Sequence, residues 1–583
     1  MINHLEGKLE RLETHLNSIF NVGELSPIPD TPPPGETGPP ALASTDPGSE
    51  DFDDSETEDP SAQQEPASAS LPLNPVVPSM HGQYTAGILG ETPCFYIPRC
   101  ISDTGAGCNS GFSVSTEEGL DWVSRKAGPS HLDLLLGSMT SVPELTTFLP
   151  PRKLFGPFPR GELLTQLLQD YMEYFNVTFP IFTRAEIDSL FADNYADPQL
   201  HGPGRWTSIQ VILAVAYLLP GSRGQPDHQV SALFMKGAMQ TINELLLAPP
   251  DLWACKSIVV MAVGFLAMAA GHPCSSLISI AVQISNQLGL GKTAAQAGLS
   301  PDQVQHQRLL FWMVCAVDIE ISYRFGLPPA QKEDIVGEAA PIDSPSSAYS
   351  VPIKDESGTF NLFDCSVELV QIRSQIIRQL YLTSAANQSF DQLLAVAGDF
   401  DQRLQTWLKK IPYDYRPDAG APPPFRNLPG WSTLLFIHYT YYDCMIAIHS
   451  LIAMRGVDSA QDLISTHSPP VLAGFSNNPR VLLSTSLTSR AARASLALMK
   501  YLPADDIHLG IAYHYPSVAM KTLASSIIRS PRPAAEVYSL RMLYQAESYL
   551  SQKARDSPLE AIRRLWKVCT DCCAVAQRAV DSA

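Results

Sequence analysis

Three cysteines near the C-terminal end are the residues best suited by type and spacing to bind a metal ion. Cys569, Cys572 and Cys573 fall close together, and the nearest cysteine before them is Cys444. A structural zinc ion takes four ligands, which usually come from two close pairs. One cluster without a second pair favours thiols in or beside a helical core, so we expect no metal ligands in this chain.

A second group of side chains lies on a stretch with helical periodicity. His438, Tyr442 and His449 recur at helical spacing and therefore fall near one face of a helix. They could line a ligand pocket, although a packed aromatic face is the more common result of such a pattern. The spacing of Ser, Cys, His and Asp residues assembles no pairing of a nucleophile with a base. We therefore predict no catalytic residues and no enzyme activity.

The run Leu288–Thr293 resembles the end of a phosphate-binding loop. The first glycine of that motif would stand where the chain has Asn286, and the segment follows a predicted helix rather than a strand. We predict no nucleotide site here and no cofactor-binding residues elsewhere.

The composition is that of a large acidic protein. The 583 residues are 45% hydrophobic, and their formal net charge is -19. A chain with this balance repels phosphate, so we expect no direct contact with nucleic acid. Eleven scattered cysteines indicate no disulfide framework, and the charged N-terminal residues do not form a signal peptide. The longest apolar run, Ile258–Gly271, is too short to cross a bilayer, so we expect a reducing compartment and no membrane contact.

The first twenty residues carry the clearest periodic pattern in the chain. Apolar residues recur at alternating spacings of three and four, the heptad pattern of a coiled coil, at Ile2, Leu5, Leu9, Leu12, Leu16 and Ile19. In a parallel pair, Lys8 of one chain would approach Glu13 of the other. We predict a coiled-coil dimerisation helix over residues 1–20. A single amphipathic helix that lies on the body is the alternative, because so short a coiled coil is marginal alone.

A polar tract follows the heptad. Residues 21–92 are rich in Pro, Ser, Ala, Asp and Glu, and no Lys or Arg occurs between Arg11 and Arg99. Such a segment cannot bury enough apolar area to offset the entropy of ordering. We predict a disordered linker over 21–92 and a partly ordered connecting segment over 93–148. The acidic stretch Asp51–Asp59 is interpreted as solvated linker, with an activation segment or a phosphorylation site at Ser55 as alternatives.

Helical periodicity dominates the chain from residue 149 to its end. Ser300 and Gln303 form a capping-box pattern, Pro301 suits a first helical turn, and Gly326 is placed to end that helix. We predict an all-α fold, a multi-helix bundle over 149–583, with loops near 341–357 and 411–429. The other helices are expected near 163–175, 206–219, 230–247, 258–270, 276–288, 360–382, 392–410, 432–454, 484–501, 534–551 and 558–579.

The stretch His306–Ala330 resembles the signature of the middle homology region of fungal-specific zinc-cluster transcription factors. That signature has a basic lead into Phe-Trp, an Asp further along and Gly-x-Pro near the helix end, which here are Arg308, Phe311, Trp312, Asp318, Gly326 and Pro328. Leu309, Leu327 and Val336 depart from the usual residues but leave the register intact. Other pieces agree in order, so that the resemblance covers about Leu149–Met454.

The resemblance implies a helical regulatory domain in a nuclear regulator of RNA polymerase II genes, with a biosynthetic gene cluster or a nutrient pathway as targets. It also implies a coiled coil placed just after a zinc cluster of six cysteines. This sequence lacks that motif, so we expect no zinc in this chain and DNA contact only through an upstream cluster or a partner. We expect a homo- or heterodimer through the heptad, contact with the transcription machinery or a DNA-binding relative, and a candidate small-molecule effector. A helical receptor or scaffold without a promoter role is the alternative.

The signature residues are expected to be structural. Phe311 and Trp312 should form a core strut in their helix. Asp318 lies in an apolar stretch, where an unpaired buried carboxylate is costly. We predict that Asp318 holds the loop beyond Gly326 or pairs with a neighbouring arginine.

Overall fold

A computed structural model describes most of the C-terminal three quarters of the chain. The described residues are 151–582, apart from gaps at 220–225, 269–270, 293–298, 333–349, 354–357, 383–386, 419–430, 465–477, 503–505, 530–532 and 557–559. The predicted coiled coil at 1–20, the linker at 21–92 and the connecting segment at 93–148 all lie outside the described residues.

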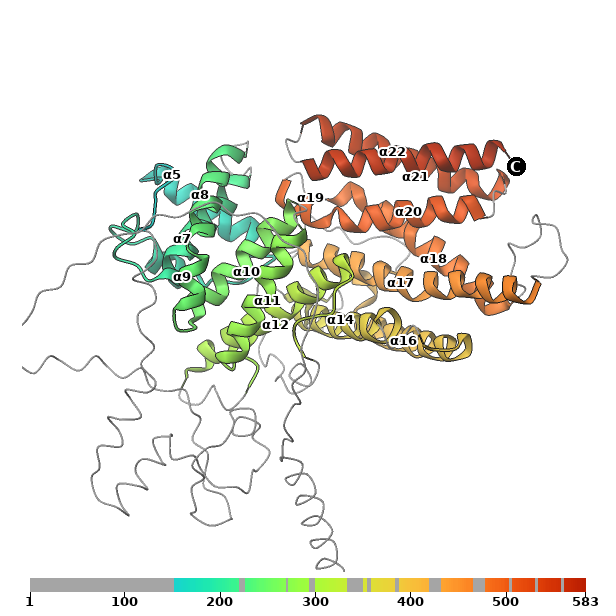
Figure 1. Ribbon diagram of the computed structural model, residues 1–583, viewed down its shortest axis with the longest axis horizontal. Coiled ribbons are helices and arrows are strands. Elements are labelled where there is room, and N and C mark those ends of the chain that lie inside the picture. The colour runs from blue at the N-terminus through green and yellow to red at the C-terminus, as the bar shows by residue number, and fades with distance from the viewer. Residues whose placement is uncertain are drawn as a thin grey trace, which may run out of the picture. The chain divides into compact units, whose positions relative to one another are not determined.

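The first group of helices surrounds one apolar core (Figure 1). Its members are α5 (Glu162–Asp170) with the π-helical turn η2 (Tyr171–Phe175), α6 (Arg184–Leu190), α7 (Pro203–Leu218), α8 (His228–Gln240), α9 (Ile242–Leu247), α10 (Leu252–Ala267), α11 (Gly271–Gln287) and α12 (Pro301–Phe325). The helices α7 and α10 are apolar on all sides and almost completely buried. Both are therefore central, and α10 packs against α7 as well as α11.

The second group surrounds another core (Figure 1). Its members are α14 (Leu362–Ile376) with the turn η6 (Ile377–Tyr381), α16 (Phe390–Lys410), η7 (Tyr413–Tyr415), α17 (Trp431–Ile464), α18 (Pro479–Ala497), η9 (Leu498–Tyr501), α20 (His514–Arg529), α21 (Pro533–Asp556) and α22 (Glu560–Asp581). The short helix α19 (Asp506–Ala512) packs mainly against α10, with Ile511 in the first core and Ala512 in the second. The helices α17 and α18 pack together, as do α21 and α22. The helix α16 shows the amphipathic pattern of an outer helix, with Phe400, Leu404 and Trp407 buried against the core.

The helix α12 belongs to both cores. Phe311 and Trp312 in its middle lie in the first core with at most 3% of their surface exposed. Tyr323 near its end packs against the second core. Different parts of this one helix therefore contribute side chains to both cores.

The mostly helical fold that the sequence predicts is confirmed, with three local differences. The predicted loop near 341–357 contains β1 (Ser350–Pro352), which pairs antiparallel with β2 (Thr359–Asn361). The helix predicted over 230–247 is divided at Thr241 into α8 and α9. The Thr241 hydroxyl donates to the Ala238 carbonyl, a local hydrogen bond that competes with the regular helix pattern. The helices α6, α19 and α20 were not predicted.

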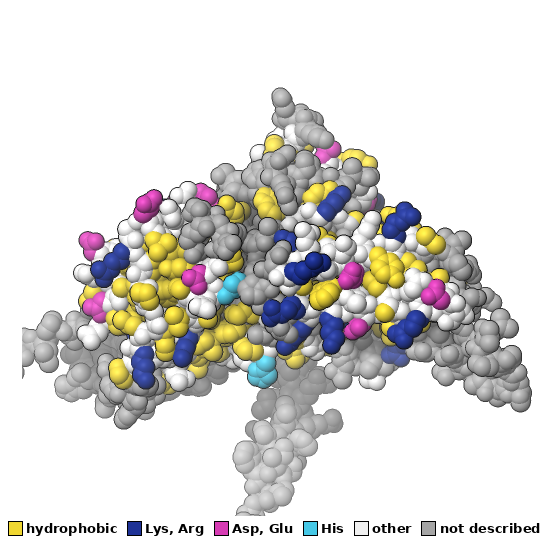
Figure 2. Space-filling model, turned by 90° about the horizontal axis from the view of Figure 1, so that it is seen from above, with side chains coloured by type: hydrophobic (Ala, Val, Ile, Leu, Met, Phe, Trp, Pro, Cys, Tyr) yellow, Lys and Arg dark blue, Asp and Glu magenta, His cyan; other side chains and the backbone are white. Residues whose placement is uncertain are grey.

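None of the described helices is long and apolar enough to span a bilayer. The acidic balance of the chain is uneven: residues 1–150 hold 22 acidic and 5 basic residues, whereas residues 151–583 hold 37 and 35. On the face in Figure 2, Lys and Arg side chains gather over the C-terminal helices. The helical part is thus close to neutral, and the acidity belongs to the N-terminal quarter.

Candidate functional site

The helix α12 has the two ends that its sequence predicts. The Ser300 amide donates to Oε1 of Gln303 at 3.0 Å, and the Gln303 amide donates to Oγ of Ser300 at 3.3 Å. At the other end Gly326 has φ 66°, a left-handed conformation that favours glycine, and the Leu327 amide donates to the Ser322 carbonyl at 2.9 Å. The capping box and the glycine stop are both confirmed.

Asp318 holds the loop that follows this stop. Its Oδ1 accepts from the Ala330 amide at 3.1 Å, and its Oδ2 accepts from the Gln331 amide at 2.9 Å. Burial raises the pKa of Asp318, although these hydrogen bonds oppose the shift. Of the two roles predicted for this carboxylate, the structure shows the first.

The described part of the run that resembles a phosphate-binding loop, residues 288–292, forms the turn that follows α11. Gly289 has φ 65°, and the Leu290 amide donates back to the Ser285 carbonyl at 3.1 Å. A Cβ on Gly291 would approach the Phe311 ring to 2.8 Å. The glycines therefore serve the helix end and its close packing on α12, where Phe311 meets Trp312 edge to face.

The other signature residues lie before and after Phe311 and Trp312 along the chain. Arg308 is half-buried one turn before Phe311, and Pro328 is exposed in the loop that Asp318 holds. The six signature residues thus lie along α12 and its exit loop without converging on one point. This placement is that of an architectural element.

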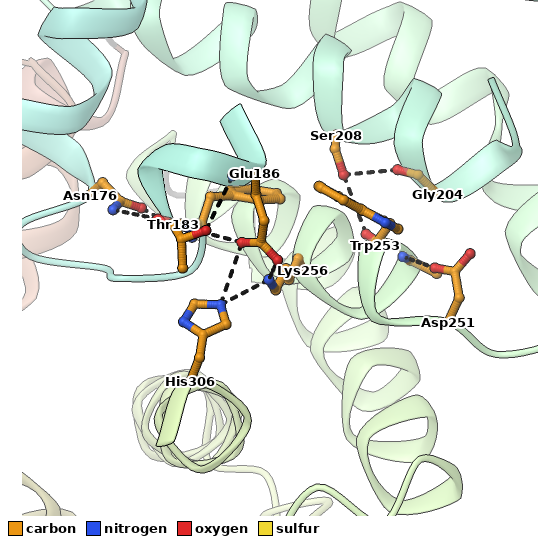
Figure 3. A network of polar contacts seen from close by, with 11 residues as sticks. Asn176, Thr183, Glu186, Gly204, Ser208, Asp251, Trp253, Lys256 and His306 are labelled. Atoms are coloured by element: carbon orange, nitrogen blue, oxygen red, sulfur yellow. Dashed lines mark hydrogen bonds and ion pairs between the residues drawn. The ribbon is translucent and has the colours of Figure 1, made fainter. Parts of the chain in front are cut away.

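A buried ion pair fixes the beginning of α12 to α6 and α10 (Figure 3). The Lys256 ammonium, whose side chain is 1% exposed, donates to Glu186 Oε1 and to Nε2 of His306 at 2.8 Å. The other oxygen of Glu186 accepts from the Thr183 amide at 2.9 Å and so completes a capping box at the start of α6. We call Glu186, Lys256 and His306 the proximal triad.

The electrostatics of the proximal triad require a neutral imidazole. Burial and the neighbouring Lys256 ammonium lower the pKa of His306 to about 4. Burial alone would raise the pKa of Glu186, but the charge and hydrogen bond of Lys256 outweigh it and the pKa is lowered. The triad therefore holds one charged pair near neutral pH, with His306 as an acceptor.

A larger group of charges lies at the other end of α12. Glu320 pairs with Arg324 one turn along and with Arg373 of α14, and Arg373 Nη2 donates to Asp443 of α17 at 2.7 Å. His514 of α20 places its Nε2 3.6 Å from the same Asp443 oxygen. We call these five residues the central ion cluster, and it joins four helices that span both cores.

Besides His514, the central ion cluster contains two acidic and two basic side chains that are held out of water. Burial alone would raise the pKa of Glu320, but the charges of Arg324 and Arg373 outweigh burial and hold the pKa well below its usual range. The Tyr515 hydroxyl donates to Glu320 Oε1 at 3.0 Å, and the guanidinium carbon of Arg373 lies 4.1 Å from the Tyr323 ring centroid. Because removal of one member would leave a charge buried without its partner, the cluster fixes the relative positions of these helices.

The three C-terminal cysteines lie on α22. Cys569 and Cys573 are buried and Cys572 is half-buried, and the Cys569 thiol points to the Leu543 carbonyl of α21 at 3.8 Å. Among the described residues, no group of three or more His, Cys, Asp or Glu side chains has the arrangement of a metal site. These thiols pack the α21–α22 contact.

His438, Tyr442 and His449 face different partners. His438 Nε2 lies 2.9 Å from the Tyr415 carbonyl, while His449 Nδ1 lies 3.3 Å from Oγ of Ser484 on α18. Burial lowers the pKa of His438 to about 4. The three side chains therefore form a packed face of α17, the second of the two predicted alternatives.

The sequence-based predictions did not include the charged residues of the proximal triad or of the central ion cluster. A signal was present, because Lys256 interrupts the apolar run of α10 and Asp443 interrupts that of α17. A charge inside an apolar helix predicts a buried partner. The identity of that partner depends on which helices pack together, which the pattern of one helix does not reveal.

Comparison with known proteins relates the sequence of this chain to a protein family. Residues 168–411 match the family model described as the fungal specific transcription factor domain. This stretch of the chain is therefore similar to a regulatory domain of fungal transcription factors. This is a family of transcription factors and not of enzymes, which agrees with the prediction of no enzyme activity.

The curated relatives support the same family over a longer stretch. The chain is 29% identical over 509 residues to an ABC-transporter-regulating transcription factor of Aspergillus oryzae, and 28% identical to one of Aspergillus fumigatus. Each alignment covers 85% of this chain and 56% of the relative, so the chain spans about half the length of the curated relatives it matches. A fusaridione A cluster transcription factor of Fusarium heterosporum is 20% identical over 44% of this chain and 49% of its own length. No solved structure matches.

The matched domain does not contain all of the central ion cluster. Glu320, Arg324 and Arg373 lie within residues 168–411, whereas Asp443 and His514 come from α17 and α20 beyond the match. Helices beyond the matched stretch therefore supply part of the central ion cluster.

Proposed function

We propose that this chain is a nuclear transcriptional regulator whose targets include genes for ABC transporters. The observation that carries the proposal is the ordered match over 85% of the chain to two proteins named as ABC-transporter-regulating transcription factors. The weaker and shorter match to a biosynthetic cluster regulator supports a gene cluster as the second candidate target.

In this proposal the helical body is the regulatory part, and DNA contact comes from a zinc cluster or a partner outside this sequence. The body supplies about as many basic as acidic residues. The heptad at 1–20 would bring two such chains together, which matches the paired half-sites that dimeric regulators read. The transcription machinery or a DNA-binding relative would then be its protein partners.

Tagged protein at its natural level in the source organism tests the proposal. Chromatin immunoprecipitation should enrich promoters of ABC-transporter genes, and deletion of the gene should lower or raise those transcripts. Enrichment at the promoters of one biosynthetic cluster would favour the second candidate. A protein found at no promoter, in a strain whose transcripts are unchanged on deletion, would instead be a receptor or scaffold.

A further inference from the structure

A cavity of about 130 Å³ lies beside the central ion cluster. Its apolar walls come from both cores: Val263 and Met313 belong to the first, and Leu369 and Ile437 belong to the second. The cavity thus sits where α10, α12, α14 and α17 meet. Any molecule that fills it contacts both cores at once.

One edge of the cavity is polar. Arg373 lines it with a side chain only 2% exposed, and its two Nη atoms bond to Glu320 and Asp443. Its Nε–H has no hydrogen-bond acceptor among the described residues, and neither does the Thr433 hydroxyl on the same wall. A buried donor without an acceptor is unfavourable, so a ligand oxygen in this cavity that accepts from it would gain a hydrogen bond.

Three of the residues that line the cavity, Ala316, Val370 and Phe436, are half-buried rather than buried. A larger side chain at such a position can extend into the cavity.

The volume and the charges define the chemistry of the occupant. An apolar cavity of about 150 Å³ holds benzene, so this slightly smaller one accommodates a single ring compound of at most about six heavy atoms. Arg373 already balances two carboxylates, and Glu320 also lines the wall. An anion would meet Glu320 and a cation would meet Arg373, which leaves a neutral molecule with an acceptor oxygen.

We propose that this cavity binds a small neutral ring compound whose carbonyl or ether oxygen accepts from Arg373 Nε–H. Because the walls come from both cores, the bound compound stabilises their contact across α12. The cavity is then the effector site of the regulatory body, and this last step rests on the function proposed above. Binding itself does not depend on that function.

The test uses the full purified chain and two probes of matched shape. Cyclopentanone carries the acceptor oxygen, and methylenecyclopentane replaces it with a CH₂ group, so that each probe is about as large as benzene. Both should show saturation-transfer NMR signals at millimolar concentration and raise the melting temperature. Ala316→Leu fills the cavity from α12 and should weaken binding of both probes at least about ten-fold, since the added methyl groups take the ring's place. Ala574→Leu adds the same atoms to the exposed face of α22 and should change neither affinity.

The hydrogen bond from Arg373 to the acceptor oxygen is tested by the ratio of the affinities for the two probes. Comparing this ratio between variants cancels the different hydrophobicity of the probes. Arg373→Lys keeps the positive charge but removes the Nε–H group. It should lower the affinity for cyclopentanone relative to methylenecyclopentane about ten-fold. Thr433→Val, which removes the second free donor, should lower the same ratio by a smaller factor.

Three results would overturn the proposal: no signal from either probe, unchanged binding in folded Ala316→Leu, or an unchanged ratio in folded Arg373→Lys. If Ala316→Leu does not fold, Val370→Phe fills the same space from α14 and decides the question in its place. Failure of binding while promoter enrichment persists would remove only the cavity assignment. Binding in a protein found at no promoter would remove the proposed function and leave the cavity.

Discussion

The two buried ion groups at the ends of α12 differ in what they connect. The proximal triad joins α6, α10 and α12 within the first core, and it holds one charged pair with a neutral His306. The central ion cluster joins α12, α14, α17 and α20 and holds two pairs, centred on Arg373. The first group therefore fixes one end of the helix inside a core, whereas the second joins the two cores. Changes in the second should reach further through the molecule.

The largest expected effect is that of Arg373→Met. This change leaves Glu320 and Asp443 buried without their shared partner, which destabilises by about 3–5 kcal/mol. Urea unfolding of purified protein measures it. Lys410→Met provides the control, because Lys410 pairs with Glu368 at an exposed site and its loss should cost less than about 1 kcal/mol. Equal losses of stability in the two variants would contradict the view that the buried cluster contributes more than an exposed ion pair.

A smaller loss is expected for Lys256→Met in the proximal triad. Glu186 loses its buried counterion but keeps the Thr183 amide and a quarter of its side-chain surface in solvent, so about 2–4 kcal/mol is expected. The same urea series measures it. A loss larger than that of Arg373→Met would reverse the ranking of the two ion groups.

The proximal triad should also make stability depend on pH. His306 has a folded pKa of about 4, below the ordinary 6.5, so the unfolded chain takes up a proton first as the pH falls. Its contribution is complete above pH 6.5 and is lost towards pH 4, by about 2–3 kcal/mol. His306→Gln keeps an acceptor for Lys256 and should flatten this part of the profile, measured by urea unfolding at each pH.

The control for this profile is His272→Gln, at an exposed position of α11. It should leave the slope between pH 6.5 and 4 unchanged. A His306→Gln profile that runs parallel to that of the unchanged protein would show that the imidazole is not held neutral.

The smallest of these effects is expected for Asp318→Ala. The Ala330 and Gln331 amides lose their acceptor. Ala330 is exposed and its amide can turn to water, whereas Gln331 is buried and its amide is left without a partner, so about 1–2 kcal/mol is expected. Thermal melting measures it against Asp302→Asn, an exposed change on the same helix. An unchanged melting curve would refute the structural role of Asp318.

The parts of α12 that depend on neighbours in sequence were predictable. Ser300 with Gln303, and Gly326 with the prolines after it, determine where the helix begins and ends because capping acts within a few residues. Asp318 was recognisable for a related reason, as a carboxylate in an apolar stretch whose partner lies just beyond the helix.

The partners of Lys256 and Arg373 were not predictable in this way. Glu186 lies 70 residues from Lys256, and Asp443 lies 70 residues from Arg373. Such pairs depend on which helices pack together, and that packing is decided by the shapes of two cores rather than by any local pattern. The role of Gly291 beside Phe311 was hidden for the same reason, since only tertiary contact distinguishes it from a loop glycine.

The most direct test of the central ion cluster is hydrogen exchange of the intact chain, followed by mass spectrometry. In the unchanged protein, peptides from α12, α14 and α17 should open together with one free energy, as a single cooperative unit. In Arg373→Met, peptides from α14 and α17 should open at lower free energy than those from α10 and α11. Uniform loss of protection across all five helices, or no change in α17, would contradict the claim that this cluster joins the two cores.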